Sequence, residues 1–221
     1  MSAMPNPVSA PKYGDNSMII RKILEHTLKR LMDLGGAALL LVALSPLFLL
    51  IALCIKFDDG GPIFYRRRVA SQEGEFDAFK FRTMVTDAEA VLNANRELRE
   101  QYERSFKLKN DPRVTRAGRL LRKYSLDELP QLLNVLMGQM SLVGPRMFTL
   151  DELKHYGKAG EIILKVRPGI TGYWQVNGRQ NVSFAEHVAM DLHYVEHWSL
   201  WMDIGILLKT PGKAISGEGA Y

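Results

Sequence analysis

The chain has 221 residues, of which 47% are hydrophobic and 24% are charged, and 29 Lys and Arg residues oppose 24 Asp and Glu residues. This apolar content can bury a core and the net charge is only +5, which excludes a chain that is disordered throughout. The single cysteine, Cys54, excludes a disulfide scaffold. The length predicts one globular domain with at most one appendage.

The N-terminal region carries a long apolar run. An amphipathic helix is predicted over residues 18–33, after a polar leader over residues 1–17 that we expect to be disordered. A run without any charged residue then extends from Leu34 to Ile55. As one helix it is about 33 Å long, enough to cross a hydrocarbon core of about 30 Å. A cleavable signal peptide is disfavoured, because the run starts late and no small-residue cleavage site follows it. The sequence therefore predicts a membrane-bound protein.

The course of this run through a membrane has two interpretations. Ser45-Pro46 lies at its midpoint, where proline removes a backbone donor and predicts a break or a strong kink. Basic residues flank the run on both sides: Arg21, Lys22, Lys29 and Arg30 precede it, and Lys56, Arg66, Arg67 and Arg68 follow it. The positive-inside rule expects one basic flank, and two cytoplasmic flanks require a re-entrant helix-break-helix hairpin. The residues alone leave this hairpin and a spanning helix open, because spanning helices tolerate proline.

The rest of the chain is predicted to be a mostly helical α+β domain. Aromatic residues alternate with charged ones in residues 63–70 and 75–84, which predicts two short strands around a turn at Gln72-Glu73-Gly74. Residues 86–107 predict a polar, solvated helix. No strand-helix alternation repeats along the chain, so neither a Rossmann sheet nor a barrel is indicated.

Residues 113–137 predict a basic helix followed by a second helix that opens on an acidic pair. Ser125 and Glu128 have the spacing of a capping box ahead of an apolar run. The simplest interpretation is that Asp127 and Glu128 are first-turn acids that favour the helix dipole. The functional alternative is that amide donors at a helix start hold a carboxylate ionised, as a nucleophile or a metal ligand requires.

Basic residues surround this pair and recur in two Gly-rich connectors, residues 137–146 and 166–179. They are Arg113, Arg116, Arg119, Arg122 and Lys123 in the basic helix, and Arg146, Arg167 and Arg179 beside Gly or Pro in the connectors. Glycine lets a backbone approach a ligand closely, and arginine binds phosphate oxygens in bidentate fashion. The combination indicates phosphoryl transfer with a divalent cation. Binding of anionic lipid headgroups is the alternative for the basic residues near the apolar run. Nucleic acid is not indicated, because no aromatic platform accompanies the charge.

A final helical stretch is predicted over residues 183–215, and it contains the pattern HYVEH from His193 to His197. This matches H-x-x-E-H, a zinc-protease pattern that places both histidines on one helix face. The neighbouring residues Tyr194, Trp198 and Trp201 favour a membrane interface or a packed helix face instead. We therefore expect no zinc site here.

Three blocks of sequence carry a wider resemblance: KFRTM (80–84), DPRVTRAGRLLRKYSLDELPQLLNVLMGQMSLVGPR (111–146) and VRPGITGYWQVNGR (166–179). Together they resemble the bacterial sugar transferase family, the monotopic polyprenyl-phosphate phosphoglycosyl transferases, from about residue 25 to the C-terminus. The DGGPIFY and SGEGAY segments look most like the short galactose-1-phosphate transferases that begin exopolysaccharides.

The resemblance implies a re-entrant hairpin with its helix break at Ser45-Pro46, which favours the hairpin over the spanning helix. Residues 18–56 would then form the lead-in and hairpin. Residues 57–221 would form a catalytic domain of amphipathic helices with a small β-hairpin. The implied location is the cytoplasmic face of the bacterial inner membrane, in contact with the bilayer. A homo-oligomer and downstream glycosyltransferases are further implied partners.

The family's reaction, carried over residue by residue, makes Asp127 the nucleophile. Asp127 would attack the β-phosphate of a UDP-sugar and release UMP, and undecaprenyl phosphate would then take the phosphosugar from the aspartate. Glu128 would assist, and Mg²⁺ near Asp127 would neutralise phosphate charge. We expect the phosphate to be shielded by Arg122, Arg146, Arg167 and Arg179, with Lys80 and Arg82 as weaker candidates.

Two positions depart from the family pattern. Met147 replaces a proline after Gly144-Pro145-Arg146, and Ala70 replaces a glycine. The sugar is expected to be galactose. Glucose stays the alternative, because the two sugars differ at one hydroxyl and no residue can be tied to recognising it. The rival from another functional class is a non-catalytic membrane adaptor with a basic face.

Overall fold

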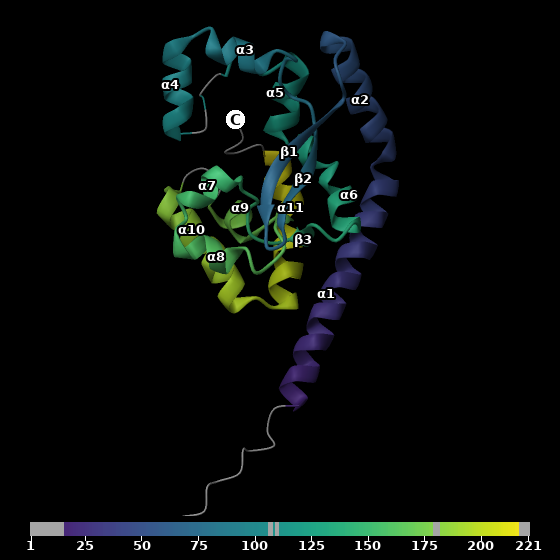
Figure 1. The fold of residues 1–221 in the computed structure, drawn as a ribbon. Coiled ribbons are helices and arrows are strands. Elements are labelled where there is room, and N and C mark those ends of the chain that lie inside the picture. The colour runs from purple at the N-terminus through teal and green to yellow at the C-terminus, as the bar shows by residue number, and fades with distance from the viewer. Residues whose placement is uncertain (1–15, 106–107, 109–110, 179–181, 217–221) are drawn as a thin grey trace, which may run out of the picture.

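The computed structural model describes residues 16–105, 108, 111–178 and 182–216, and it opens on two consecutive helices along one side of the molecule (Figure 1). These are α1 (Asn16–Ala43) and α2 (Ser45–Asp59), bent by 61° at the break between them. Pro46 lies in the first turn of α2, where its missing N–H costs no hydrogen bond. The predicted helix break is confirmed. The lead-in and the first half of the apolar run are instead one helix that begins at Asn16, and residues 1–15 of the leader lie outside the described residues.

The outer surface of this pair is apolar. None of the described helices is by itself both long and apolar enough to cross a bilayer, whereas α1 and α2 together meet the requirement of length and composition. Large apolar side chains are exposed along both helices, among them Ile23, Leu24, Leu31, Leu39, Leu49, Leu50, Leu53 and Phe57. A patch of this length on a soluble surface marks a contact with lipid or protein.

The predicted β-hairpin is confirmed and lies at the centre of the domain. It consists of β1 (Phe64–Ser71) and β2 (Gly74–Phe81), antiparallel with Tyr65 opposite Lys80. The predicted polar helix is two helices, α3 (Ala88–Asn93) and α4 (Arg96–Ser105). The basic helix is α5 (Arg116–Lys123), and α6 (Gln131–Leu136) follows it. Helix α2 packs on the hairpin and α5 through Ile51 and Ile55 against Phe81 and Leu121.

The two Gly-rich connectors are not purely loops. They contribute β3 (Ser141–Val143) and β4 (Gly169–Thr171), which pair in parallel, and α9 (Tyr173–Asn177) follows directly. Strands this short carry too little side-chain alternation to be recognised in sequence. A parallel pair needs a crossover, which α7 (Leu150–Lys154) and α8 (Lys158–Ile163) supply.

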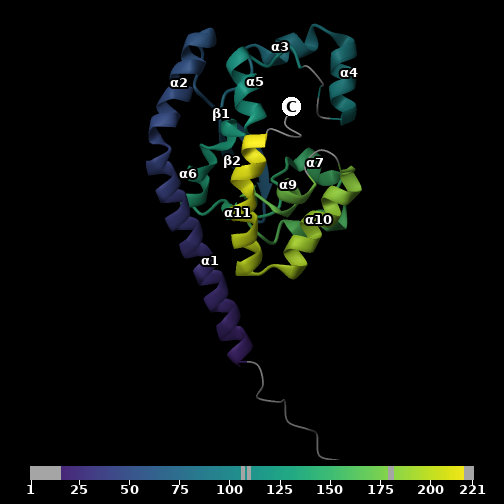
Figure 2. The same cartoon turned by 180° about the vertical axis from the view of Figure 1, so that it is seen from behind.

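The C-terminal helices close the core from behind. The predicted final stretch is α10 (Phe184–His197) and α11 (Leu200–Ser216), and Figure 2 shows α11 crossing between α10 and α1. Ile206 of α11 joins a core that includes Ala37 of α1, Val69 and Ala78 of the hairpin, and Val135 of α6. This core thus joins α1, the hairpin, α6 and α11, whereas the contacts of α2 with α5 belong to a second cluster.

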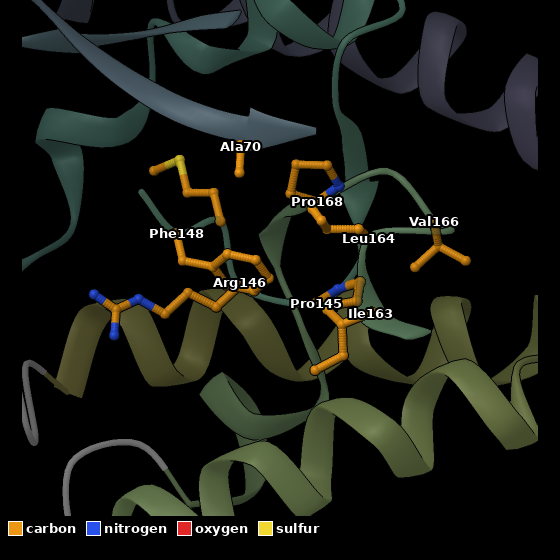
Figure 3. Close-up of a pocket in the computed structure, with 9 residues that line it drawn as sticks. Ala70, Pro145, Arg146, Phe148, Ile163, Leu164, Val166 and Pro168 are labelled. Atoms are coloured by element: carbon orange, nitrogen blue, oxygen red, sulfur yellow. The ribbon is translucent and has the colours of Figure 1, made fainter. Parts of the chain in front are cut away.

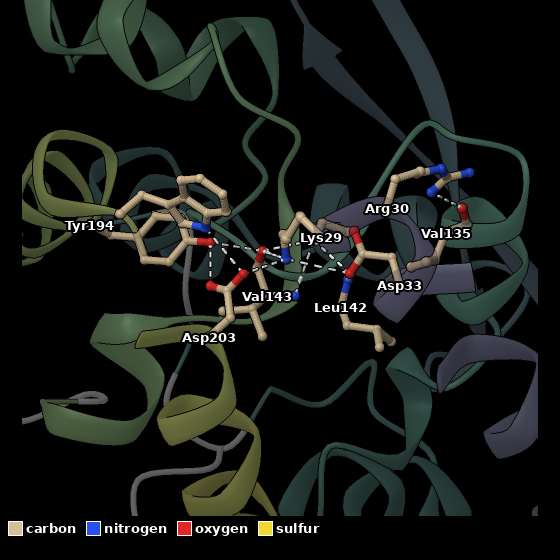
Figure 4. Close-up of polar contacts among 10 residues, drawn as sticks. Lys29, Arg30, Asp33, Val135, Leu142, Val143, Tyr194 and Asp203 are labelled. Atoms are coloured by element: carbon tan, nitrogen blue, oxygen red, sulfur yellow. Dashed lines mark hydrogen bonds and ion pairs between the residues drawn. The ribbon is translucent and has the colours of Figure 1, made fainter. Parts of the chain in front are cut away.

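A buried polar cluster, here called the Lys29 clamp, fastens α1 to this core (Figure 4). It consists of Lys29, Asp33 and Asp203, with Lys29 Nζ 2.8 Å from Asp203 Oδ2 and 3.4 Å from Asp33 Oδ1. Lys29 also donates to the carbonyl oxygen of Val143 at 3.0 Å. Arg30 donates to the carbonyl oxygen of Val135 at 2.8 Å. Lys29 and Arg30, expected as basic flanks at a membrane surface, are therefore partly buried against the domain.

Candidate active site

The acidic pair lies on a single tight turn between α5 and α6. Asp127 and Glu128 belong to a 3₁₀ turn, Leu126–Glu128, and Ser125 before it has a left-handed φ of 56°. The Ser125 side chain makes no cap hydrogen bond, so the predicted capping box is wrong. A left-handed serine is uncommon, and such conformations gather at functional sites. The turn presents both carboxylates without a helix N-terminus to stabilise them.

Lys80 of β2 bridges the two carboxylates. Its Nζ lies 2.5 Å from Glu128 Oε1 and 3.9 Å from Asp127 Oδ2. The three side chains are partly open, with 15% of Lys80, 13% of Asp127 and 26% of Glu128 exposed. Lys80, predicted as a weaker phosphate-binding candidate, thus contacts the two carboxylates directly, and its binding of phosphate stays a prediction.

The electrostatic surroundings shift the pKa values of the two carboxyl groups in opposite directions. Burial raises the pKa of Asp127, and the neighbouring Glu128 carboxylate adds to this effect. Burial also acts to raise the pKa of Glu128, but Lys80, Arg146 and Arg67 outweigh it and hold that pKa below its ordinary value. The surroundings therefore favour the ionised form of Glu128 and disfavour that of Asp127, which a further positive charge nearby would stabilise. The sequence argument for Asp127, that helix amides hold it ionised, fails on this turn.

Arg122, in the last turn of α5, also acts on the pair. Its Nε donates to Thr83 Oγ1 at 2.9 Å, and its charge acts to lower the pKa of Asp127. The close approach of α5 depends on Gly118, because a Cβ there would lie 2.1 Å from the carbonyl oxygen of Thr83. A glycine at this helix position thus sets the height of Arg122 over the turn.

Arg146 and Arg67 complete the positive surroundings from the opposite side. Both pair with Glu152 at the start of α7: Arg67 Nη2 lies 2.8 Å from Oε2, and Arg146 Nη2 lies 3.8 Å from Oε1. Sequence reasoning did not single out Arg67 as a site residue. The signal was available in the hairpin register, because Arg67 is opposite Ala78 and so shares a face with Lys80.

The remaining predicted phosphate ligands have other placements. Arg82 is buried and its guanidinium is taken up by Asp59 and by the carbonyl oxygens of Pro62 and Met84. It therefore ties the end of α2 to the hairpin, contrary to the phosphate-binding role expected of it. Arg167 is exposed, next to the β3–β4 pair. Arg179 lies outside the described residues.

The histidine pattern forms no metal site in the described part of the chain. His193 and His197 stack on each other with ring centroids 4.4 Å apart, and His193 also contacts Tyr173 at 5.0 Å. No group of three or more His, Cys, Asp or Glu side chains that could hold a metal occurs among the described residues. The expectation of a packed helix face agrees with these contacts.

One small cavity lies behind Arg146, lined by Ala70, Pro145, Phe148, Ile163 and other apolar residues (Figure 3). Its volume is about 10 Å³, close to the space of one water molecule. Figure 3 shows the Arg146 guanidinium extending away from these side chains. The cavity is therefore a packing gap, and the acidic pair with its surrounding cations is the candidate site.

The comparison with protein families decides between the classes that this geometry allows. Residues 24–217 match the family model described as bacterial sugar transferase. The chain belongs to this family. The matched range contains the Lys29 clamp, the acidic turn and α11.

Several relatives resemble this sugar transferase closely. The exopolysaccharide production protein ExoY of Sinorhizobium fredii is 48% identical over 198 residues, covering 87% of this chain and 88% of that protein. The undecaprenyl-phosphate galactose phosphotransferase of Salmonella typhimurium is 44% identical, covering 88% of this chain and 42% of that protein. The UDP-galactose-lipid carrier transferase of Erwinia amylovora is 41% identical over 239 residues, covering the whole chain and 50% of that protein. The chain thus spans nearly all of the first relative and about half of the other two.

Proposed function

We propose that this protein transfers a hexose-1-phosphate from a UDP-sugar to undecaprenyl phosphate, releasing UMP, as the first step of an exopolysaccharide or another surface glycan. Galactose-1-phosphate is the proposed group, with glucose-1-phosphate as the alternative. The observation that carries the proposal is the carboxylate pair bridged by Lys80 and surrounded by Arg122, Arg146 and Arg67. Membership of the sugar transferase family and the names of the relatives support it.

The proposed reaction proceeds in two displacements at phosphorus. A carboxylate oxygen of Asp127 forms a bond to the β-phosphorus of the donor, and the bond from that phosphorus to the bridging oxygen breaks as UMP leaves. An oxygen of the lipid phosphate then attacks the same phosphorus and the Asp127 carboxylate leaves. Glu128, ionised beside Lys80, accepts a proton from the lipid phosphate when that group arrives protonated. Each displacement brings anions together, so the cationic side chains lower its barrier.

Mg²⁺ is the proposed cofactor, and the residues present fit it. Magnesium binds through one or two carboxylates together with waters and substrate phosphates, without a full protein cage. Asp127 would hold the ion, and its raised pKa identifies it as the carboxylate that gains most from a nearby cation. The bound ion would supply charge neutralisation to the donor diphosphate.

The same proposal places the protein on the cytoplasmic face of the inner membrane. The bent pair α1 and α2 would enter the bilayer as a re-entrant hairpin, with Leu49, Leu50 and Leu53 in contact with lipid. Helix α2 packs directly on the hairpin and α5, which carry Lys80 and Arg122. The acidic turn would therefore lie near the headgroups, where a water-soluble donor and a lipid acceptor can both reach it.

The test is a transfer assay with radiolabelled UDP-sugars and membranes that contain the protein. We expect a lipid-linked sugar and an acid-stable label on the protein, both lost in Asp127→Asn. Asp151→Asn is the matched control, because Asp151 is exposed and pairs only with Lys154 in the described part of the chain. Unchanged transfer by Asp127→Asn would contradict the nucleophile assignment. Absence of product from every UDP-sugar, with membrane binding intact, would favour the adaptor alternative.

The sugar is identified by a donor panel in the same assay. UDP-galactose, UDP-glucose and the UDP-N-acetylhexosamines are compared at equal concentration. We expect the largest kcat/KM with UDP-galactose. A larger value with UDP-glucose would replace galactose by glucose without affecting the rest of the proposal.

A further inference from the structure

A second polar cluster, which takes no part in the reaction above, lies behind Arg146. It consists of Asp191 and His187 of α10 and Trp174 of α9. Asp191 is fully buried, and His187 Nε2 lies 3.4 Å from its Oδ2. The His187 and Trp174 rings are 4.2 Å apart at their centroids. Within the described part of the chain, the indole nitrogen of Trp174 makes no hydrogen bond, and the Asp191 carboxylate has only the His187 ring and the Arg146 amide near it.

A buried carboxylate in this state is costly for the fold. Burial raises the pKa of Asp191 to about 7, although the backbone amide and charge of Arg146 act in the opposite direction. The other ionisable groups that face it are His187 on its own helix and Tyr156 from the segment between α7 and α8. An apolar residue would be more stable here, because a fully buried carboxylate with so few partners destabilises a protein. The position therefore calls for a functional explanation.

The cluster contacts the acidic turn through one residue. The Arg146 guanidinium lies 5.9 Å from the centroid of the Trp174 ring, and its charge lowers the pKa of Glu128. The backbone of Arg146 also faces Asp191. Its neighbour Pro145 is fixed to β4 by the amide of Gly169, which donates to the Pro145 carbonyl oxygen at 2.9 Å. The main chain of Arg146 thus lies beside Asp191, and its guanidinium lies beside the Trp174 ring. The charge of the same guanidinium acts on Glu128.

We propose that Asp191, supported by His187 and Trp174, is a positioning residue for Arg146, and that it keeps this arginine directed at Glu128 and at the diphosphate of the donor. The inference rests on the proposed function. A negative charge at Asp191 attracts the Arg146 amide and guanidinium. Loss of that charge lets the arginine move, and small displacements of a charged group strongly reduce electrostatic stabilisation at a reacting phosphate.

The test is a double-mutant cycle on hexose-phosphate transfer with Asp191→Asn, Arg146→Ala and the double variant. We expect Asp191→Asn to lower kcat/KM by about 10-fold to 100-fold, and the double variant to be no worse than Arg146→Ala. In the wild type the rate falls as the pH drops below 7, and Asp191→Asn removes this limb of the profile. Glu196→Gln, an exposed change on the same helix, is the matched control and leaves rate and profile unchanged.

Two outcomes would overturn the inference. Either Asp191→Asn transfers at the wild-type rate at every pH, or the effects of Asp191→Asn and Arg146→Ala multiply in the double variant, as independent sites would. His187→Gln is the milder second variant, and the same reduced acidic limb is expected of it.

The melting temperature provides a readout that needs no substrate. We expect Asp191→Asn to raise the melting temperature at pH 8, because the substitution removes a charge that is buried in the wild type at that pH. At pH 4 we expect no change, because the wild-type group is already protonated. A lower melting temperature at pH 8 would mean an ordinary structural role and would contradict positioning. If no UDP-sugar is turned over, the proposed function fails while this measurement still tests the strain at Asp191.

Discussion

The molecule contains two clusters in which one lysine lies between two acids. In the Lys29 clamp, Lys29 contacts Asp33 and Asp203, and in the acidic turn Lys80 contacts Asp127 and Glu128. The charges are the same, and the shorter ion-pair distances are similar.

The difference lies in the hydrogen bonds that each carboxylate receives. Asp33 accepts from Ser141 Oγ and the Leu142 amide at 3.0 Å each. Asp203 accepts from Tyr194 Oη at 2.8 Å and from Trp198 Nε1 at 3.1 Å. In the described part of the chain, Asp127 accepts no hydrogen bond from another residue's side chain, and Glu128 accepts one, from Lys80.

Asp33 and Asp203 each receive three contacts from surrounding groups, and these contacts hold the structure together. Carboxylates with unused lone pairs can take up a metal ion or attack phosphorus. Unused acceptor capacity therefore distinguishes the acidic turn from the Lys29 clamp.

The largest effect is expected from breaking the clamp. Lys29→Met leaves Asp33 and Asp203 buried without their cation, and removing one partner of a buried ion pair costs about 3–5 kcal/mol. Denaturant unfolding in mild detergent measures the loss. Lys22→Met, an exposed change on the same helix, is the control and is expected to unfold like the wild type. Equal stability of the two variants would show that the clamp does not hold α1.

The corresponding change at the turn is expected to affect the reaction and spare the fold. Lys80→Met removes a cation that faces developing charge, which lowers kcat/KM by about 100-fold, equivalent to about 3 kcal/mol of barrier. The unfolding midpoint stays close to that of the wild type, because the two carboxylates remain partly exposed. Arg68→Met on the same hairpin, where the arginine side chain is 61% exposed, is the control and retains full activity. Loss of folding in Lys80→Met would make the turn a second clamp.

The close packing that sets Arg122 over the turn gives an intermediate effect. In Gly118→Ala the new Cβ meets the Thr83 carbonyl oxygen, so α5 has to move, at a cost of about 1–3 kcal/mol. Transfer activity falls with it. Gly35→Ala, where a Cβ meets no atom within 4 Å, is the control and unfolds no earlier than the wild type. Normal activity in Gly118→Ala would separate the position of α5 from catalysis.

The smallest effect is the change in stability when an aspartate is replaced by asparagine, and we expect opposite signs for it in the two clusters. The raised pKa of Asp127 means that the folded state binds its proton more tightly than the unfolded state, so stability falls as the pH rises through the folded pKa. Asp127→Asn is therefore expected to be more stable than the wild type at pH 7.5 and equally stable at pH values below the unfolded pKa. Asp203→Asn is expected to lose stability at pH 7.5. Melting curves at the two pH values measure both, and a loss in Asp127→Asn would contradict the burial argument.

Sequence patterns predicted the elements that are long or strongly alternating. The break at Ser45-Pro46, the hairpin around Gln72-Glu73-Gly74 and the final helices are confirmed because proline chemistry and hydrophobic period act locally. The β3–β4 pair escaped prediction because its three-residue strands are specified by contacts between distant segments.

The site was predicted in part for the same reason. The acidic pair was recognisable from the resemblance, and Lys80 from its block KFRTM. The contacts of Arg82 and Lys29 were not, because a charged residue in sequence carries no sign of which carboxylate, such as Asp59 or Asp203, lies beside it in the fold. Arg67 was hidden in a run of three arginines whose faces only strand register separates.

The Lys29 clamp also has a consequence for the order of synthesis. Lys29 and Asp33 precede Asp203 in the chain, so they leave the ribosome well before it. Until then α1 has only part of its charge neutralised, so its final attachment to the domain waits for α11 to fold. Contacts between segments so far apart form late in folding. A chain interrupted before α11 would therefore carry the apolar helix pair without the Asp203 contact of the Lys29 clamp. Helix α11 thus completes the attachment of α1 to the domain.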